Sequence, residues 1–273
     1  MTSRPVRIPD LKDKKARGEK IAILTAYDAT MARLLDGAGV DALLVGDSVG
    51  MVMLGYDTTL PVTLDMMIHH TRAVVRGTRR ALVIADMPFL TYQVSVPEAV
   101  RNAGRLLQEG GAVAVKLEGG RPILEVVSRL VDVGIPVMGH LGLQPQSIHQ
   151  LGAYTKQATE PREAARLIED AVALEQAGVF ALVLEQIPAT LARDLSARLA
   201  VPTIGIGAGP DCDGQILVSH DVLGLFDRFV PSFVKQYAHL AGTVTTAARE
   251  YVEDVRSGRY PEVAAATSRV PTA

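Results

Sequence analysis

Cysteine and tryptophan are nearly absent from this chain, whose 273 residues include one cysteine, Cys212, and no tryptophan. A single cysteine excludes an intrachain disulfide, so we expect a protein of the reducing cytoplasm. The chain also has no large excess of positive or negative charge, because 28 basic and 30 acidic residues give a formal net charge of −2. Nucleic-acid binders normally carry a basic face that neutralises phosphates, so we expect no nucleic-acid partner.

Long hydrophobic segments are missing as well. No uninterrupted apolar run reaches the about 18–20 residues that a membrane helix needs. The first residues, "MTSRPVRIPDLKDKKARGEK", are basic but have no apolar core of the kind found in signal peptides. We therefore expect no membrane association. Hydrophobic residues still make up 48% of the chain, which is ample for a buried core.

Eight short apolar runs recur along the chain, and amphipathic segments separate most of them. The runs are "IAILTAY" (21–27), "DALLVGD" (41–47), "ALVIADM" (81–87), "AVAVKLE" (112–118), "IPVMGHL" (135–141), "VFALVLE" (179–185), "VPTIGIG" (201–207) and "GQILVSHD" (214–221). Most are continuous rather than alternating, which is typical of parallel strands covered on both faces. The amphipathic segments are 29–38, 64–77, 97–109, 122–133, 161–177 and 189–199.

Eight strands that alternate with helices within about 250 residues predict a (β/α)8 barrel. The main alternative is an open doubly wound sheet, which would normally carry a glycine fingerprint after its first strand. The stretch "TAYDAT" at that place has no such fingerprint. We expect an N-terminal arm at 1–20, a barrel at 21–258 and a flexible tail at 259–273. The segment 141–159 is long for a strand-to-helix loop, and such loops are often functional.

Nearly every predicted strand ends in a polar or ionisable residue. In a barrel the active site lies at the carboxyl ends of the strands, so these residues are candidates for it. They are Asp47 and Ser48, Asp86, Lys116 and Glu118, His140, and Glu185. A turn explains any one acid beside a glycine, but it explains the whole set poorly. The last two strands end in "GIGAG" and in His220–Asp221, which tight packing and helix capping explain equally well.

Three of the candidates are carboxylates from neighbouring strands: Asp47, Asp86 and Glu118. In one cavity they would repel each other unless a cation lay between them. Oxygen ligands favour Mg²⁺ over zinc, and Mg²⁺ commonly keeps several waters, so we expect two acids to bind directly and the third through water. Lys116 is an ion-pair partner for an acid or an anchor for an anion. His140 is a structural histidine or a site residue.

Several longer stretches together resemble the ketopantoate hydroxymethyltransferase (3-methyl-2-oxobutanoate hydroxymethyltransferase) family. The stretches are the segment 25–74, "ADMPFLTY" (85–92), "AVKLEGG" (114–120), "GHLGLQPQSIHQLGAY" (139–154), "LVLEQIP" (182–188) and "PTIGIGAGPDCDGQILVSHDVLGL" (202–225). The resemblance covers roughly residues 5–255, and it is the combination of stretches that makes it specific.

The resemblance implies a (β/α)8 enzyme of pantothenate biosynthesis. Such an enzyme transfers a hydroxymethyl group from 5,10-methylenetetrahydrofolate to 3-methyl-2-oxobutanoate, uses Mg²⁺ and often forms a decamer. The residues it implies are Asp47, Asp86 and Glu118 at the metal, Asp47, Ser48, Asp86 and Lys116 at the keto acid, and Glu185 as the proton acceptor. We expect His140 to bond a substrate oxygen or to support the metal site. The residues that contact the folate are not indicated.

Three other functions remain open from the sequence. The same acids could serve a metal-dependent keto-acid lyase or mutase of the phosphoenolpyruvate mutase and isocitrate lyase type. Lys116 could form a Schiff base, although neighbouring acids would tend to keep it charged. A binding barrel without catalysis gives no reason for acids at so many strand ends.

Overall fold

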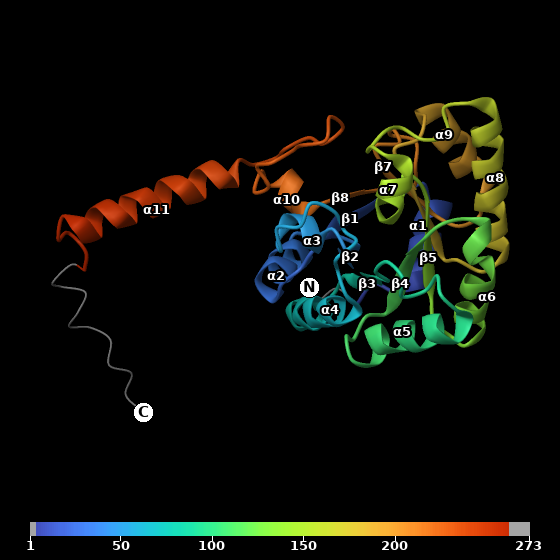
Figure 1. The fold of residues 1–273 in the computed structure, drawn as a ribbon, viewed down its shortest axis with the longest axis horizontal. Coiled ribbons are helices and arrows are strands. Elements are labelled where there is room, and N and C mark those ends of the chain that lie inside the picture. Colours follow the sequence, from blue (N-terminus) through green and yellow to red (C-terminus); the bar gives the residue numbers. More distant parts are fainter. Residues whose placement is uncertain (1–3, 262–273) are drawn as a thin grey trace. The chain divides into compact units, whose positions relative to one another are not determined.

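The structure, a computed structural model, describes residues 4–261. Within this range eight parallel strands pair in chain order and β1 also pairs with β8, so that the sheet closes into a barrel (Figure 1). The strands are β1 Ile21–Thr25, β2 Ala42–Val45, β3 Leu82–Asp86, β4 Ala114–Glu118, β5 Val137–Gly142, β6 Ala181–Glu185, β7 Thr203–Ile206 and β8 Gly214–Leu217. The predicted (β/α)8 barrel is confirmed, and the open sheet is excluded.

Helices follow the first six strands and cover the outside of the barrel. They are α2 Ala29–Gly37, α3 Val49–Val52, α4 Leu64–Gly77, α5 Val96–Gln108, α6 Leu124–Asp132, α7 Ile148–Leu151, α8 Pro161–Gln176 and α9 Ala189–Arg198, with 3-10 turns η1 Arg121–Ile123 and η2 Pro145–Ser147. Local signals begin several of them: Asp28 caps α2 by accepting from two backbone amides, and Pro161 opens α8. No helix among the described residues is long and apolar enough to cross a membrane.

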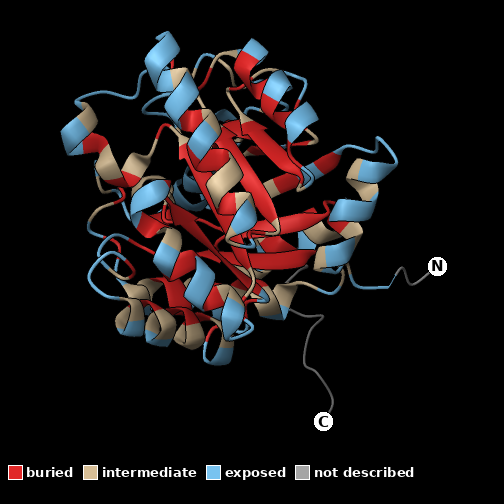
Figure 2. Ribbon diagram, turned by 90° about the vertical axis from the view of Figure 1, so that its right-hand side faces the viewer, coloured by how far each residue is buried: buried red, intermediate tan, exposed pale blue. Residues whose placement is uncertain are grey.

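Side chains of the strands alternate between the barrel interior and the layer beneath the helices. On β3, Leu82 and Ile84 belong to the interior cluster, while Val83 and Ala85 pack in the outer cluster. The strands are therefore buried on both faces, whereas the outer faces of the helices are exposed (Figure 2). Since the period is two residues, Asp86 also falls on the interior side, at the carboxyl end of the strand.

The first twenty residues contain a helix, α1 (Ile8–Ala16). Leu11 of α1 is fully buried and belongs to the interior cluster of the barrel. Lys14 pairs with Asp41 at 2.9 Å, and Lys15 pairs with Asp213 at 2.7 Å. These two acids precede β2 and β8, so α1 is held at the amino ends of the strands.

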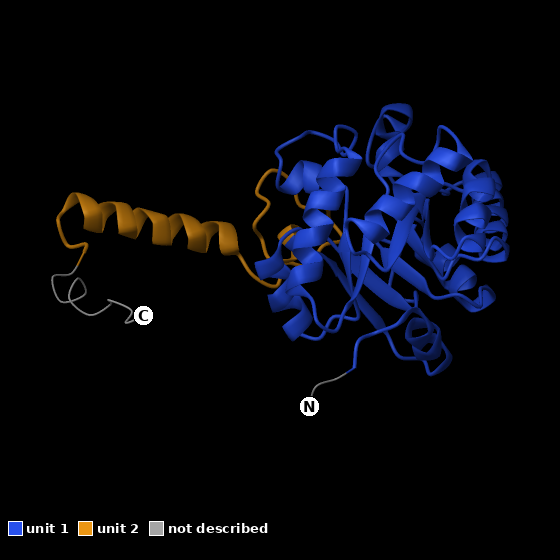
Figure 3. Cartoon of the chain, turned by 90° about the horizontal axis from the view of Figure 1, so that it is seen from below, with its two compact units in different colours: residues 1–219 blue, residues 220–273 orange. Residues whose placement is uncertain are grey.

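The chain divides into two compact units, residues 1–219 and 220–273 (Figure 3). The first unit holds the barrel. The second holds α11 (Leu240–Arg256), in which no residue is buried, and the short α10 (Ser219–Val222) spans the boundary. Most of the expected tail, residues 262–273, lies outside the described residues.

Candidate active site

The polar strand ends form one layer above the apolar interior of the barrel. The register places Asp86 opposite Lys116 and Glu118 opposite His140. Asp86, Lys116, Glu118 and His140 all continue the inward-facing alternation of their strands and are at least nine-tenths buried. The same alternation that fills the barrel with Leu, Ile and Val thus delivers ionisable groups to its carboxyl end.

Hydrogen bonds and ion pairs connect the three predicted metal carboxylates. The backbone N–H of Asp47 donates to Asp86 Oδ2 at 3.0 Å. Lys116 Nζ lies 3.1 Å from Asp86 Oδ1 and 3.8 Å from Glu118 Oε1. The ammonium group of Lys116 therefore partly compensates the negative charge of the acids from within the cluster.

His140 joins this cluster to Glu185. Its Nδ1 lies 3.6 Å from Glu118 Oε1, and its Nε2 lies 3.2 Å from Glu185 Oε2. Burial and Lys116 lower the pKa of His140, but the neighbouring carboxylates of Glu118 and Glu185 outweigh them and raise that pKa to about 9. The two carboxylates therefore favour the protonated form of His140, while Lys116 Nζ, 3.2 Å from Nδ1, opposes it.

The three acids have different environments. Burial, together with the charges of Asp86 and Glu118, raises the pKa of Asp47 well above its ordinary value. Burial also raises the pKa of Asp86, although Lys116 opposes the rise. At Glu118 burial acts upward, but His140, Lys116 and the hydrogen bond from the backbone N–H of Gln146 outweigh it, and the pKa of Glu118 falls. Of the three acids, Asp47 is the one whose negative charge is least compensated by its neighbours.

Ser48 lies beside Asp47 at the start of α3 and is half-buried. Its hydroxyl is 2.8 Å from the Tyr27 hydroxyl. Gly46 makes this arrangement possible, because a Cβ there would lie 2.7 Å from Ser48 Oγ and 3.5 Å from Asp86 Oδ2. A side chain at position 46 would therefore displace the Ser48 hydroxyl from its place beside Tyr27.

The donor chemistry of the cluster fits a hard cation such as Mg²⁺. Asp86 Oδ1 is buried and makes no hydrogen bond, in spite of its ion pair with Lys116. The oxygen donors and the unbonded carboxylate oxygen suit a hard cation, which takes one or two carboxylates and completes its coordination with water. Among the described residues no group of three His, Cys, Asp or Glu side chains is placed to hold a metal ion.

The sequence did not indicate Gln146, Tyr92 or Tyr27. Gln146 lies in η2 and donates to Asp47 Oδ2 at 2.9 Å. The Tyr92 hydroxyl lies 2.8 Å from Gln146 Oε1 and accepts from the backbone N–H of Glu118. The sequence signals near Gln146 are the length of the segment 141–159 and the family-like stretch 139–154, and both contain this residue.

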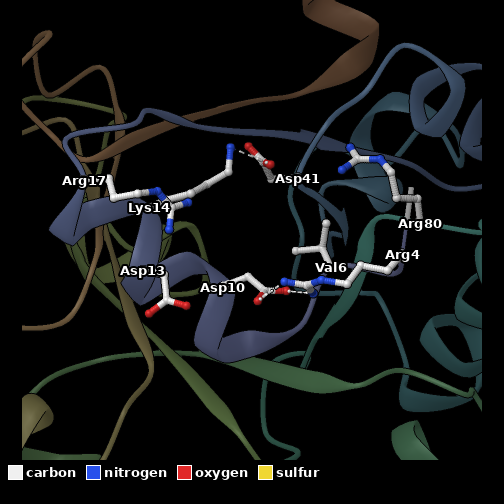
Figure 4. Close-up of a pocket in the computed structure, with 8 residues that line it drawn as sticks. All are labelled: Arg4, Val6, Asp10, Asp13, Lys14, Arg17, Asp41 and Arg80. Carbon is white, nitrogen blue, oxygen red and sulfur yellow. Dashed lines mark hydrogen bonds and ion pairs between the residues drawn. The ribbon is translucent and has the colours of Figure 1, made fainter. Parts of the chain in front are cut away.

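A pocket of ≈ 200 Å³ lies elsewhere, beside α1 and the amino ends of β2 and β3 (Figure 4). Its charged side chains largely pair with one another, as Arg4 does with Asp10 and Lys14 with Asp41. None of the predicted site residues lines it. The predicted site residues lie instead at the carboxyl ends of the strands.

Solved structures share this fold at low identity. A phosphonopyruvate hydrolase in complex with oxalate and Mg²⁺ matches with a TM-score of 0.61 and 14% identity, covering 96% of this chain and 92% of that one. A 2,3-dimethylmalate lyase of the phosphoenolpyruvate mutase and isocitrate lyase superfamily matches with a TM-score of 0.60 and 17% identity, covering 94% and 86%. Identities this low show likeness of fold alone.

Curated relatives are much closer in sequence. The 3-methyl-2-oxobutanoate hydroxymethyltransferase of Moorella thermoacetica is 60% identical, over 94% of this chain and 96% of the relative. The enzyme of the same name from Chlorobaculum tepidum is 59% identical, over 91% of each. A family model described as ketopantoate hydroxymethyltransferase matches residues 5–263. The chain therefore belongs to the ketopantoate hydroxymethyltransferase family and is a one-carbon transferase.

Proposed function

We propose that this enzyme transfers a hydroxymethyl group from 5,10-methylenetetrahydrofolate to 3-methyl-2-oxobutanoate, giving 2-dehydropantoate for pantothenate synthesis. The observation that carries the proposal is the connected cluster of Asp47, Asp86, Lys116, Glu118 and His140, with Glu185 next to it. The folate donor follows from the family, and no residue is assigned to it.

The keto acid is a small anion, and the site offers two groups that suit its carboxylate. Lys116 supplies a buried positive charge, and Ser48 supplies a hydroxyl held by Tyr27. Both lie beside the acids, so a substrate bound by them would have its ketone near the carboxylate cluster. The partners of the enzyme are then small molecules.

The chain must also remove a proton from C3 of the keto acid. Glu185 is the proposed base, because it is an acid at a strand end and only 15% of its side chain is exposed. His140 holds the Glu185 carboxylate at 3.2 Å. In this arrangement both ring nitrogens of His140 face protein side chains, which favours a supporting role over direct contact with substrate.

Asp47, Asp86 and Glu118 are the proposed holders of Mg²⁺. When bound, the ion would supply Lewis-acid stabilisation for charge that develops on the substrate ketone. Support comes from the donor set described above and from the Mg²⁺ complex of the structurally similar phosphonopyruvate hydrolase. Asp86 and Asp47 remain joined through the backbone N–H of Asp47, which keeps the two carboxyl groups adjacent.

The assembly and location are also proposals. We propose a cytoplasmic homo-oligomer, a decamer by family resemblance. Helix α11 exposes Val244, Tyr251 and Val255 by 59%, 57% and 45%, and a second copy of the chain is the occupant that we propose for this apolar face. Sedimentation at several concentrations tests it, and a monomer at all of them would contradict it.

Hydrogen–deuterium exchange at C3 of 3-methyl-2-oxobutanoate tests the enolising half of the reaction. The enzyme in D2O with Mg²⁺ should exchange this proton, and a chelator should stop the exchange, as followed by proton NMR. Exchange without product on addition of 5,10-methylenetetrahydrofolate would favour the alternative, a keto-acid lyase or mutase of the isocitrate lyase type. Absence of exchange with Mg²⁺ present would overturn the proposal.

A further inference from the structure

Gln146 is a 5% exposed side chain that bonds two of the clustered acids at once. Its backbone N–H donates to Glu118 Oε2 at 3.0 Å. Its side-chain Nε2 donates to Asp47 Oδ2 at 2.9 Å. A loop that follows β5 thus connects the carboxylate at the end of β4 to the carboxylate after β2.

The carboxamide of Gln146 has one satisfactory orientation. Its Nε2 also donates to the carbonyl of Met87 at 2.9 Å, so it serves two acceptors. Its Oε1 lies 2.8 Å from the Tyr92 hydroxyl and accepts from Gln93 Nε2 at 3.3 Å. A flipped carboxamide would place its oxygen against the Asp47 carboxylate and the Met87 carbonyl, neither of which has a hydrogen to donate when Asp47 is ionised.

The bonds from Gln146 to Glu118 and Asp47 each engage one of the two oxygens of the carboxylate. Because Asp47 Oδ2 and Glu118 Oε2 are engaged by Gln146, Oδ1 of Asp47 and Oε1 of Glu118 are left for other partners. Glu118 Oε1 indeed faces Lys116 and His140. At 3.0 and 2.9 Å both contacts have the length of good hydrogen bonds, so the backbone N–H of Gln146 restrains the rotation of the Glu118 carboxylate and its side chain restrains that of Asp47.

We propose that Gln146 is a positioning residue: it fixes the rotation of the Asp47 and Glu118 carboxylates so that each presents one defined oxygen to the metal and keto-acid site, and Tyr92 fixes Gln146. This inference rests on the proposed function, because it assigns an orientation to the proposed metal carboxylates. Residues that orient metal ligands commonly contribute about 10–100-fold to metal affinity.

Mn²⁺ binding to the full-length protein without keto acid, followed by electron paramagnetic resonance, tests the proposal. Gln146→Met keeps the length of the side chain but removes its four side-chain bonds, including the one to Asp47, and leaves the backbone bond to Glu118 in place. It should weaken Mn²⁺ binding about 10–100-fold. Gln150→Met makes the same change at an exposed position of the same loop and should bind Mn²⁺ as the wild type does. Saturating Mn²⁺ should restore much of the C3 exchange in Gln146→Met, which a folding defect would not allow.

Tyr92→Phe provides a second route if Gln146→Met does not fold. It removes the hydroxyl that holds Gln146 Oε1, and it should weaken Mn²⁺ binding in the same direction. The Tyr92 hydroxyl also bonds the backbone N–H and carbonyl of Glu118. The double variant, where it folds, should therefore lose less Mn²⁺ affinity than the sum of the two single losses, because part of each loss acts through the orientation of Gln146. Wild-type affinity in a folded Gln146→Met, or in Tyr92→Phe where the former does not fold, would overturn the positioning role. Failure of the wild type itself to bind Mn²⁺ would instead count against the proposed metal site.

Discussion

Lys116 Nζ lies 3.1 Å from Asp86 Oδ1, and the two side chains are 6% and 4% exposed. The register places their Cα atoms opposite each other on β4 and β3. Asp86, Glu118 and Asp47 all raise the pKa of Lys116, and together they outweigh the opposite effect of burial. The lysine is therefore charged, and the site holds a buried ionic network at the mouth of the barrel.

Replacing Lys116 by Met should destabilise the protein by about 3–5 kcal/mol, because buried acids would lose their compensating charge. Urea unfolding in the presence of a chelator would measure this loss. Lys12→Met is the matched control, since Lys12 is exposed on α1, and it should change stability by no more than about 0.5 kcal/mol. Equal stability of the two variants would show that the network does not depend on Lys116.

Replacing Asp86 by Ala should abolish Mg²⁺-dependent exchange at C3 of the keto acid. The variant loses a carboxylate that we assign to the metal and the acceptor of the Asp47 N–H. Asp86→Asn keeps an acceptor oxygen for that N–H and should fold, yet it should also lose most of the exchange, as measured by proton NMR in D2O. Retained exchange in the folded Asn variant would count heavily against the metal assignment.

Glu185→Gln should still bind 3-methyl-2-oxobutanoate, while its exchange rate at C3 falls by about 10²–10⁴-fold, the usual contribution of a general base. Calorimetric titration of the keto acid would establish that binding survives. Glu163→Gln on the exposed surface of α8 is the control and should exchange normally. A normal rate in Glu185→Gln would show that another group removes the proton.

The fold could be predicted because each buried parallel strand has its own local signature. Continuous apolar runs and their polar ends are short-range features, and closure of the barrel then brings Asp86, Lys116 and Glu118 together by register. Gln146 could not be predicted in this way, since its partners lie at positions 47, 87, 92 and 118. The helix α1 was not predicted, because its sequence is mostly charged and has a single buried residue, Leu11, which gives no helical period of apolar residues.

Cys212 should be inert in the folded protein. Its side chain is fully buried, and burial raises the pKa of its thiol, so little thiolate forms near neutral pH. Ellman's reagent should therefore release no colour from the native enzyme and about one equivalent in denaturant, as the single cysteine requires. Rapid labelling of the native protein would mean that the loop between β7 and β8 opens frequently.

Leu11→Ala tests whether α1 is part of the barrel core. Leu11 is 0% exposed and packs with the interior side chains of the strands, so truncation should cost about 2–5 kcal/mol of unfolding free energy. Leu34→Ala on α2 is the matched control, because Leu34 is 60% exposed and its truncation should have little effect. Urea unfolding of both variants gives the comparison. If α1 were a loosely attached arm, the two substitutions would have similarly small effects, whereas a core helix makes the Leu11 variant much less stable.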